Sequence, residues 1–138
     1  MTKRMLMALS VILLVMPSMA ILAKDVQVVV LPFDVHSIED LAYLKTEIPK
    51  LMANQLKSEG AVILNPPVVA DLAWRDKLKG IAEIRRLGVQ FGADYVIWGS
   101  MTRIGKRFSL DAKMLESYGE GDPLVFFLEG EGMPNLLK

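Results

Sequence analysis

The segment at residues 26–33 constrains the fold of this chain more than any other part of its sequence. It reads V-Q-V-V-V-L-P-F, with Gln27 as its only polar side chain. A strand with one wet face alternates in polarity, whereas an almost unbroken apolar run is typical of a strand buried on both faces. Pro32 cannot donate to a sheet ladder, so we expect the strand to end there and residues 34–37 to form a connection.

Two amphipathic segments follow at helical spacing. The first covers residues 38–58, and its apolar stripe consists of Leu41, Leu44, Ile48, Leu51, Met52 and Leu56. Because proline is disruptive in a helix interior, Pro49 predicts a short helix at 38–45, then a break, and a main helix at 48–58. The second helix is marked by Ile81, Ile84, Leu87 and Phe91, with Gly92 in the capping position.

The remaining pattern favours strands. We expect a short strand at 61–64 and three longer ones at 95–102, 107–116 and 124–128, joined as an antiparallel meander with a hairpin turn at Gly105. Residues 68–78 are ambiguous, with Trp74 as a packing residue, and residues 133–138 have the pattern of a helix start. The order β-α-β-α-β-β-β predicts an α/β (α+β) two-layer sandwich, in which a mixed sheet of about five strands carries two main helices on one face.

The first twenty residues have the pattern of a secretory signal peptide. Lys3 and Arg4 precede an apolar run at 5–16, and small residues follow at Ser18 and Ala20. The run is shorter than the roughly 20 apolar residues of a spanning helix. We predict a signal peptide at 1–20, with cleavage after Ala23 as the alternative, and a single domain at 24–138 that does not span the membrane and whose last helix is cut short.

Composition narrows the class of protein further. The chain has no cysteine, so disulfides, thiolate chemistry and a cysteine-linked lipid anchor are not expected. Its 16 basic residues equal its 16 acidic residues, which gives no reason to expect nucleic acid as a partner. An exported, cysteine-free domain fits the bacterial periplasm, with outer-membrane association or an extracellular location as alternatives.

Several segments resemble a known group of bacterial envelope domains. Residues 28–33 are similar to the opening strand V-A-V-L-P-F of that group, and residues 87–102 resemble its core L-G-x-x-L-G-A-D-Y-V-x-x-G-S-x-T. Gly105 and residues 109–113 continue the match. The group includes the amino-terminal domain of TolB, FlgO-type flagellar domains, CsgG and domains that precede VCBS-type propeller repeats. The resemblance covers about residues 26–132 and implies their fold and a docking role.

The residues that carry this resemblance have structural interpretations. Gly88 and Gly92 would allow close helix packing and then a turn, since glycine has no Cβ. Asp94 could brace the entry to the following strand. Gly99, inside a strand, indicates a bulge or a close backbone approach. The motif therefore predicts a fold and not an active site.

Three sets of residues could carry chemistry or binding. His36 is the only histidine, and a Ser-His-Asp arrangement with Ser37 and Asp34 can be imagined, although a surface role is the simpler interpretation. Acidic residues that could hold a metal are Glu120, Asp122, Glu129 and Glu131, which also suit a solvated edge strand. Basic residues that could meet an acidic partner or lipid are Lys45, Lys50, Lys57, Arg103, Lys106 and Arg107.

Tyr95 and Trp98 could form an aromatic platform for a peptide, with a core role as the simpler interpretation. We therefore assign no catalytic, cofactor-binding or metal-binding residue and expect no enzyme. The expected function is a periplasmic protein-binding module that recruits an outer-membrane or Tol-Pal-like envelope partner through an exposed strand edge or the open side of the sheet. The alternative functions are an amino-terminal fragment of a TolB- or VCBS-type propeller protein and a small hydrolase that uses His36.

Overall fold

The computed structural model describes residues 25–131, where one sheet of six strands forms the centre of the fold. Its order is β3-β1-β4-β5-β6, and β2 also pairs with β4. The strands are β1 (Gln27–Val30), β2 (Asp34–Ser37), β3 (Val62–Ile63), β4 (Tyr95–Ile104), β5 (Arg107–Glu116) and β6 (Leu124–Glu131). The helices are α3 (Leu44–Ser58), the 3₁₀ turn η1 (Pro67–Ala70), α4 (Trp74–Lys77) and α5 (Ile81–Gln90).

The predicted mixed α/β sandwich is confirmed. β1 runs parallel to both β3 and β4, and β4, β5 and β6 form the expected antiparallel meander. The ambiguous segment at 68–78 contains most of η1 and all of α4. The predicted signal peptide at 1–20 and the predicted helix start at 133–138 lie outside the described residues.

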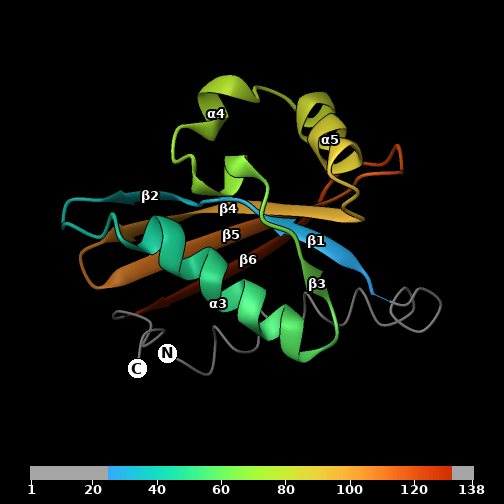
Figure 1. Cartoon of the computed structure of the whole chain (residues 1–138). Helices are drawn as coiled ribbons and strands as arrows, with labels where there is room; N and C mark the ends of the chain where they lie inside the picture. The colour runs from blue at the N-terminus through green and yellow to red at the C-terminus, as the bar shows by residue number, and fades with distance from the viewer. Residues whose placement is uncertain (1–24, 132–138) are drawn as a thin grey trace.

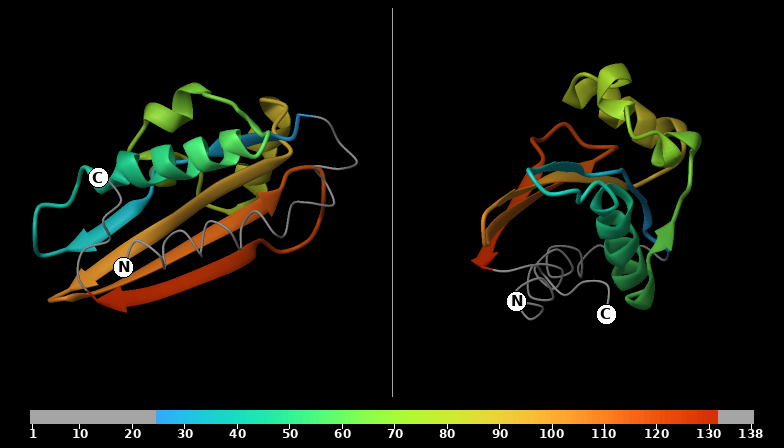
Figure 2. Two further views of the ribbon diagram at one scale, coloured as in Figure 1. Left: turned by 90° about the horizontal axis from the view of Figure 1, so that it is seen from below. Right: turned by 90° about the vertical axis from the view of Figure 1, so that its left-hand side faces the viewer.

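The arrangement of the helices differs from the expectation in one respect. Helix α3 packs on one face of the sheet, and α4 and α5 lie on the opposite face (Figures 1 and 2). The reason is topological, because β1 lies between β3 and β4. The connection through α3 leads from β1 to β3 on one side of it. The connection through α5 then leads from β3 past β1 to β4 on the other side. Right-handed crossovers in opposite directions place their helices on opposite faces.

Two hydrophobic clusters result from this arrangement. Alternate residues of β1 and β4, such as Val28 and Ile97, pack with the stripe of α3 that includes Ile48. The intervening residues, such as Val96, pack with Trp74 and with Ile84 of α5. The predicted burial of residues 26–33 on both faces is therefore confirmed: Val28, Val29 and Leu31 are fully buried.

Residues 31–33 interrupt a strand that then continues, which corrects the expectation of a connection at 34–37. β1 pairs with the first part of β4 and β2 with its second part. Across the interruption, Leu31 N–H donates to the Ile97 carbonyl at 2.8 Å, and the indole Nε1 of Trp74 donates to the Pro32 carbonyl at 2.9 Å. These groups thus keep hydrogen bonds although the regular ladder stops.

Pro49 lies inside a single helix, which corrects the prediction of two helices at 38–45 and 48–58. Helix α3 includes Pro49 without a break, and residues 38–43 are not helical. A proline in a helix interior leaves the carbonyl four residues earlier without its usual donor. That carbonyl, of Lys45, accepts a hydrogen bond from Phe33 N–H at 3.0 Å. The proline and the interrupted strand therefore complement each other.

This pairing predicts an unusually small effect for Pro49→Ala. An ordinary interior proline costs about 3 kcal/mol relative to alanine. Here we expect the free energy of unfolding to rise by less than about 1 kcal/mol, because the new N–H at position 49 competes with Phe33 N–H for the same carbonyl. Urea unfolding of both proteins measures the difference. A gain close to 3 kcal/mol would contradict the compensating role of Phe33.

The residues of the family-like motif have the structural roles inferred from the sequence. A Cβ on Gly88 would collide with Ser117 and lie 3.0 Å from a Val96 methyl, so α5 packs closely on the sheet only because this residue is glycine. Gly92 and Gly105 have positive φ values of 71° and 60°, as turns require. Asp94 Oδ2 accepts the Gln27 N–H at 2.8 Å and so ties the start of β4 to β1.

Candidate functional site

The structure does not bring His36 into a catalytic arrangement. His36 is exposed on β2, in register with Thr102. Side chains alternate along a strand, so Ser37 points to the other face, and its Oγ accepts the Glu39 N–H at 3.1 Å. Asp34 pairs with Arg75 at 2.6 Å. The imagined Ser-His-Asp arrangement is therefore not formed.

The acidic candidates are also separated. Glu129 and Glu131 lie on β6 beside Arg107 of β5, at nitrogen–oxygen distances of 3.6 and 4.0 Å. Glu120 and Asp122 precede the other end of β6. No group of three or more potential metal ligands gathers within residues 25–131. These carboxylates do not converge on one site.

The basic candidates occupy separate surfaces. Lys45, Lys50 and Lys57 follow α3, where Lys50 pairs with Glu47 at 3.5 Å. Arg103, Lys106 and Arg107 surround the β4–β5 hairpin, where Arg103 Nε donates to the Gly105 carbonyl at 3.1 Å. Arg107 has the glutamate partners described above. Solvated faces with local pairing account for these residues except Arg103, whose Nη1 is buried without a partner among the described residues.

Tyr95 and Trp98 lie on opposite faces of β4, so they cannot form one platform. Tyr95 belongs to the cluster beneath α3, and Trp98 to the cluster beneath α5. Both side chains are buried, with exposed fractions of 7% and 4%. The simpler interpretation of both residues as core is confirmed.

The position of Tyr95 predicts a sensitivity to alkaline pH. Burial raises the pKa of Tyr95 above its ordinary value of 10.0, and the charges of Glu116 and Asp94 add to the effect. The folded state therefore favours the neutral phenol. The stability from this group is complete below pH 10 and is lost as the pH rises through the higher folded-state pKa.

We accordingly expect the free energy of unfolding to fall above pH 10, and Tyr95→Phe to reduce the slope of that fall. Urea unfolding on both sides of pH 10 measures the slope. Equal slopes in the two proteins would show that Tyr95 does not contribute. Tyr118→Phe, at an exposed tyrosine, is the matched control.

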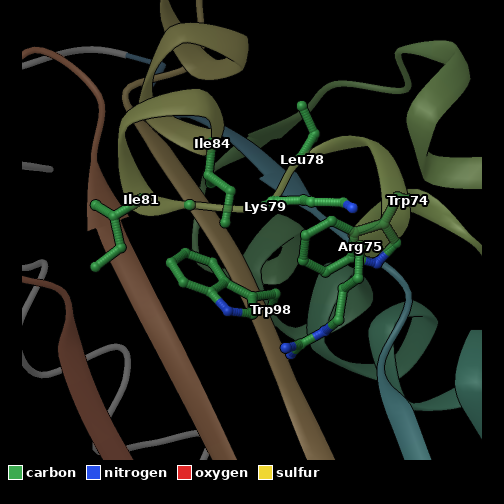
Figure 3. Close-up of a pocket in the computed structure, with 8 residues that line it drawn as sticks. Trp74, Arg75, Leu78, Lys79, Ile81, Ile84 and Trp98 are labelled. Atoms are coloured by element: carbon green, nitrogen blue, oxygen red, sulfur yellow. The ribbon is translucent and has the colours of Figure 1, made fainter.

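A groove of about 360 Å³ lies on the face of the sheet opposite α3, between α4 and the start of α5. Figure 3 shows the residues that line it, which are Trp74, Arg75, Leu78, Lys79, Gly80, Ile81, Ile84 and Trp98. The Arg75 guanidinium carbon lies 5.1 Å from the centre of a Trp74 ring. Sequence reasoning missed this groove, because its walls come from the ambiguous segment at 68–78 and from a tryptophan interpreted only as core.

The second candidate surface is the edge of β6, which has no second neighbouring strand among residues 25–131. This strand ends the sheet order, and its eight residues make it longer than β3, at the opposite end of the order, with two. Val125 and Phe127 are 62% and 63% exposed on the face that α3 does not cover. Figure 2 shows β6 at the rim of the curved sheet, away from the helices of that face.

Comparison with solved structures shows what this fold is similar to. Lipoprotein GNA1162 from Neisseria meningitidis superposes with a TM-score of 0.56 at 20% identity, over 80% of this chain and 84% of that one. The LpoB C-terminal domain from Salmonella enterica gives 0.56 at 13% identity, over 79% and 85%. The PelC dodecamer from Paraburkholderia phytofirmans gives 0.52 at 12% identity, over 82% and 76%. At these identities the likeness establishes the fold alone.

No family model matches the sequence, and no curated protein matches it either. The resemblance to TolB, FlgO-type and CsgG domains stays a prediction. Across residues 25–131, none of the helices has both the length and the apolar character that a bilayer crossing requires.

Proposed function

We propose that the chain is a non-catalytic protein-binding module of the bacterial cell envelope, which takes an extended segment of a partner onto the free edge of β6. The observation that carries this proposal is the edge itself. An unpaired edge offers a row of backbone donors and acceptors for another strand. Exposed Val125 and Phe127 offer apolar contacts to alternate side chains of that strand.

Charge restricts pairing to the first part of the edge. Residues 124–128 carry no charge, whereas Glu129 and Glu131 follow directly. Charged side chains on an edge strand are a common protection against indiscriminate pairing. The partner segment therefore spans about five residues of β6, and its side chains opposite Val125 and Phe127 are apolar.

Two observations support an envelope location. The sequence at 1–20 has the pattern of a signal peptide. The fold is shared with a Neisseria lipoprotein and with the C-terminal domain of LpoB. Under this proposal the exported chain begins after Ala20 or Ala23, and its intact mass, measured after expression with export, tests the cleavage. These structures lend no support to the alternative of a propeller fragment.

Site-specific crosslinking tests the edge. A photo-reactive residue replaces Phe127 in the exported protein, and the control carries it at Asn54, exposed on α3. We expect one envelope protein to crosslink from position 127 and not from 54. The purified partner should then bind Val125→Glu at least about tenfold more weakly than the unchanged protein, since a charge would enter the apolar part of the new strand pair.

Asn54→Ala is the matched control for binding and should leave the affinity unchanged. Equal crosslinking from both positions would overturn the proposed edge. Unchanged affinity of Val125→Glu would overturn it as well, because no strand could pair there without contact at that position.

A further inference from the structure

The groove between α4 and α5 combines unused hydrogen-bond donors with an apolar lining. Trp98 is 4% exposed, yet its indole Nε1–H has no hydrogen-bond partner among residues 25–131. The second indole of the groove, of Trp74, is occupied by the Pro32 carbonyl. This nitrogen is not among the buried unpaired atoms of the described residues, so the N–H of a largely buried side chain remains accessible to solvent and to an acceptor on a ligand.

Two cations add to this donor. Lys79 lines the groove, and its ammonium group has no partner within the described part of the chain. Arg75 pairs with Asp34 through Nε, which leaves its terminal nitrogens free of any other described partner. In the view of Figure 3, the charged ends of Lys79 and Arg75 extend toward the two indole rings. The available polar side chains of the groove are therefore all donors.

Neither nearby carboxylate forms an ion pair with the Lys79 ammonium group. Asp34 pairs with Arg75, and Glu83, which keeps its negative charge, accepts only the backbone N–H of Lys79, at 3.1 Å. Neither of them lines the groove. The ammonium group of Lys79, just before the start of α5, thus has no ion-pair partner among residues 25–131. A negatively charged group that accepts hydrogen bonds complements this set.

The size and the apolar lining of the groove restrict which ligand could carry this negatively charged group. Leu78, Ile81 and Ile84 complete the apolar wall, and the groove is open to solvent on one side. Its volume of about 360 Å³ is at the small end of the range of roughly 300–1,000 Å³ for ligand sites. A single apolar residue fits into such a space with room to spare, and the open side allows a chain to continue outward.

We propose that this groove binds the C-terminal residue of a peptide chain, with its carboxylate on the Trp98 indole N–H, Lys79 and Arg75, and its apolar side chain against Leu78, Ile81 and Ile84. Capture of a terminal carboxylate is a known mode of peptide recognition. The groove is a separate site from the β6 edge, and this binding does not depend on strand addition there.

Nuclear magnetic resonance of the exported protein tests the site, because its two tryptophans give two indole N–H signals. The probes are N-acetyl-alanyl-leucine and the same dipeptide with a C-terminal amide. We expect the free acid to shift the Trp98 signal strongly and the Trp74 signal weakly, since the latter N–H already donates to Pro32. The amide should bind at least about tenfold more weakly, because it loses the charge-assisted hydrogen bonds. Trp98→Phe assigns the signals.

Lys79→Gln should weaken binding of the acid by about threefold to tenfold. Lys77→Gln is the matched control, because Lys77 pairs with Asp71 at 2.7 Å outside the groove, and it should bind like the unchanged protein. Equal binding of acid and amide, absence of a Trp98 shift, or equal loss in both lysine variants would overturn the proposal. Hexanoate binding as tightly as the dipeptide would overturn the peptide as occupant in favour of a free apolar carboxylate.

Discussion

Replacement of Gly99 with valine is expected to unfold the protein or to lower its free energy of unfolding by at least about 3 kcal/mol. Gly99 lies in the middle of β4, and a Cβ there would collide with the Asp111 carbonyl oxygen of β5. The same Cβ would lie 2.7 Å from the Phe33 ring and 3.0 Å from the Ala112 Cα. Two of these three contacts are with backbone, which cannot move aside without breaking the β4–β5 pairing.

Gly99→Ala adds the Cβ alone and should show a smaller loss in the same direction, so the prediction stays testable if the valine variant does not fold. Gly121→Ala is the matched control, because no atom lies within 4 Å of its added Cβ, and it should change stability by no more than about 0.5 kcal/mol. Urea unfolding gives all of these values. A Gly99→Ala protein as stable as the control would show that the strands do not approach closely.

Truncation of Trp74 is expected to cause the second large loss in the free energy of unfolding. We expect Trp74→Ala to lower the free energy of unfolding by about 3–5 kcal/mol, because the side chain is only 1% exposed and anchors the cluster beneath α4 and α5. Trp74→Phe keeps a ring but removes the donor to the buried Pro32 carbonyl. That change alone should cost about 1–3 kcal/mol, since an unsatisfied buried acceptor remains.

Leu72→Ala controls for the removal of an apolar side chain from the same loop, because Leu72 is exposed, and it should lie within about 0.5 kcal/mol of the unchanged protein. Chemical unfolding monitored by far-ultraviolet circular dichroism avoids dependence on tryptophan fluorescence. Equal stability of the Phe variant and the unchanged protein would show that water satisfies the Pro32 carbonyl equally well.

The strands and helices with a clear period were predictable from the sequence. The alternation at 107–116 and the stripe around Ile84 depend on local burial, which a single sequence expresses directly. The strand after Pro32 and the unbroken helix through Pro49 were not predictable. The strand depends on pairing with the distant β4, and the helix depends on a hydrogen bond from Phe33 N–H to the Lys45 carbonyl. No local pattern shows which distant strand or donor will serve.

The candidate sites were predictable to different degrees. The exposed strand edge was anticipated in kind, since the last apolar strand of a meander ends a sheet. The groove was not, because Trp98 looks like any buried aromatic of a central strand until the position of its indole N–H is known. The separation of Ser37 from Asp34 and His36 follows from strand alternation, which the interpretation of 34–37 as a connection concealed.

The interruption at residues 31–33 joins the layers on the two sides of the sheet. One of its polar groups bonds to α3 and another to Trp74 of α4, on the opposite face. Detachment of either layer breaks one of these hydrogen bonds and exposes part of a hydrophobic cluster to water. The Phe33 amide should therefore exchange its hydrogen with solvent only when the entire domain opens, so that the protein loses both helical layers in one cooperative transition.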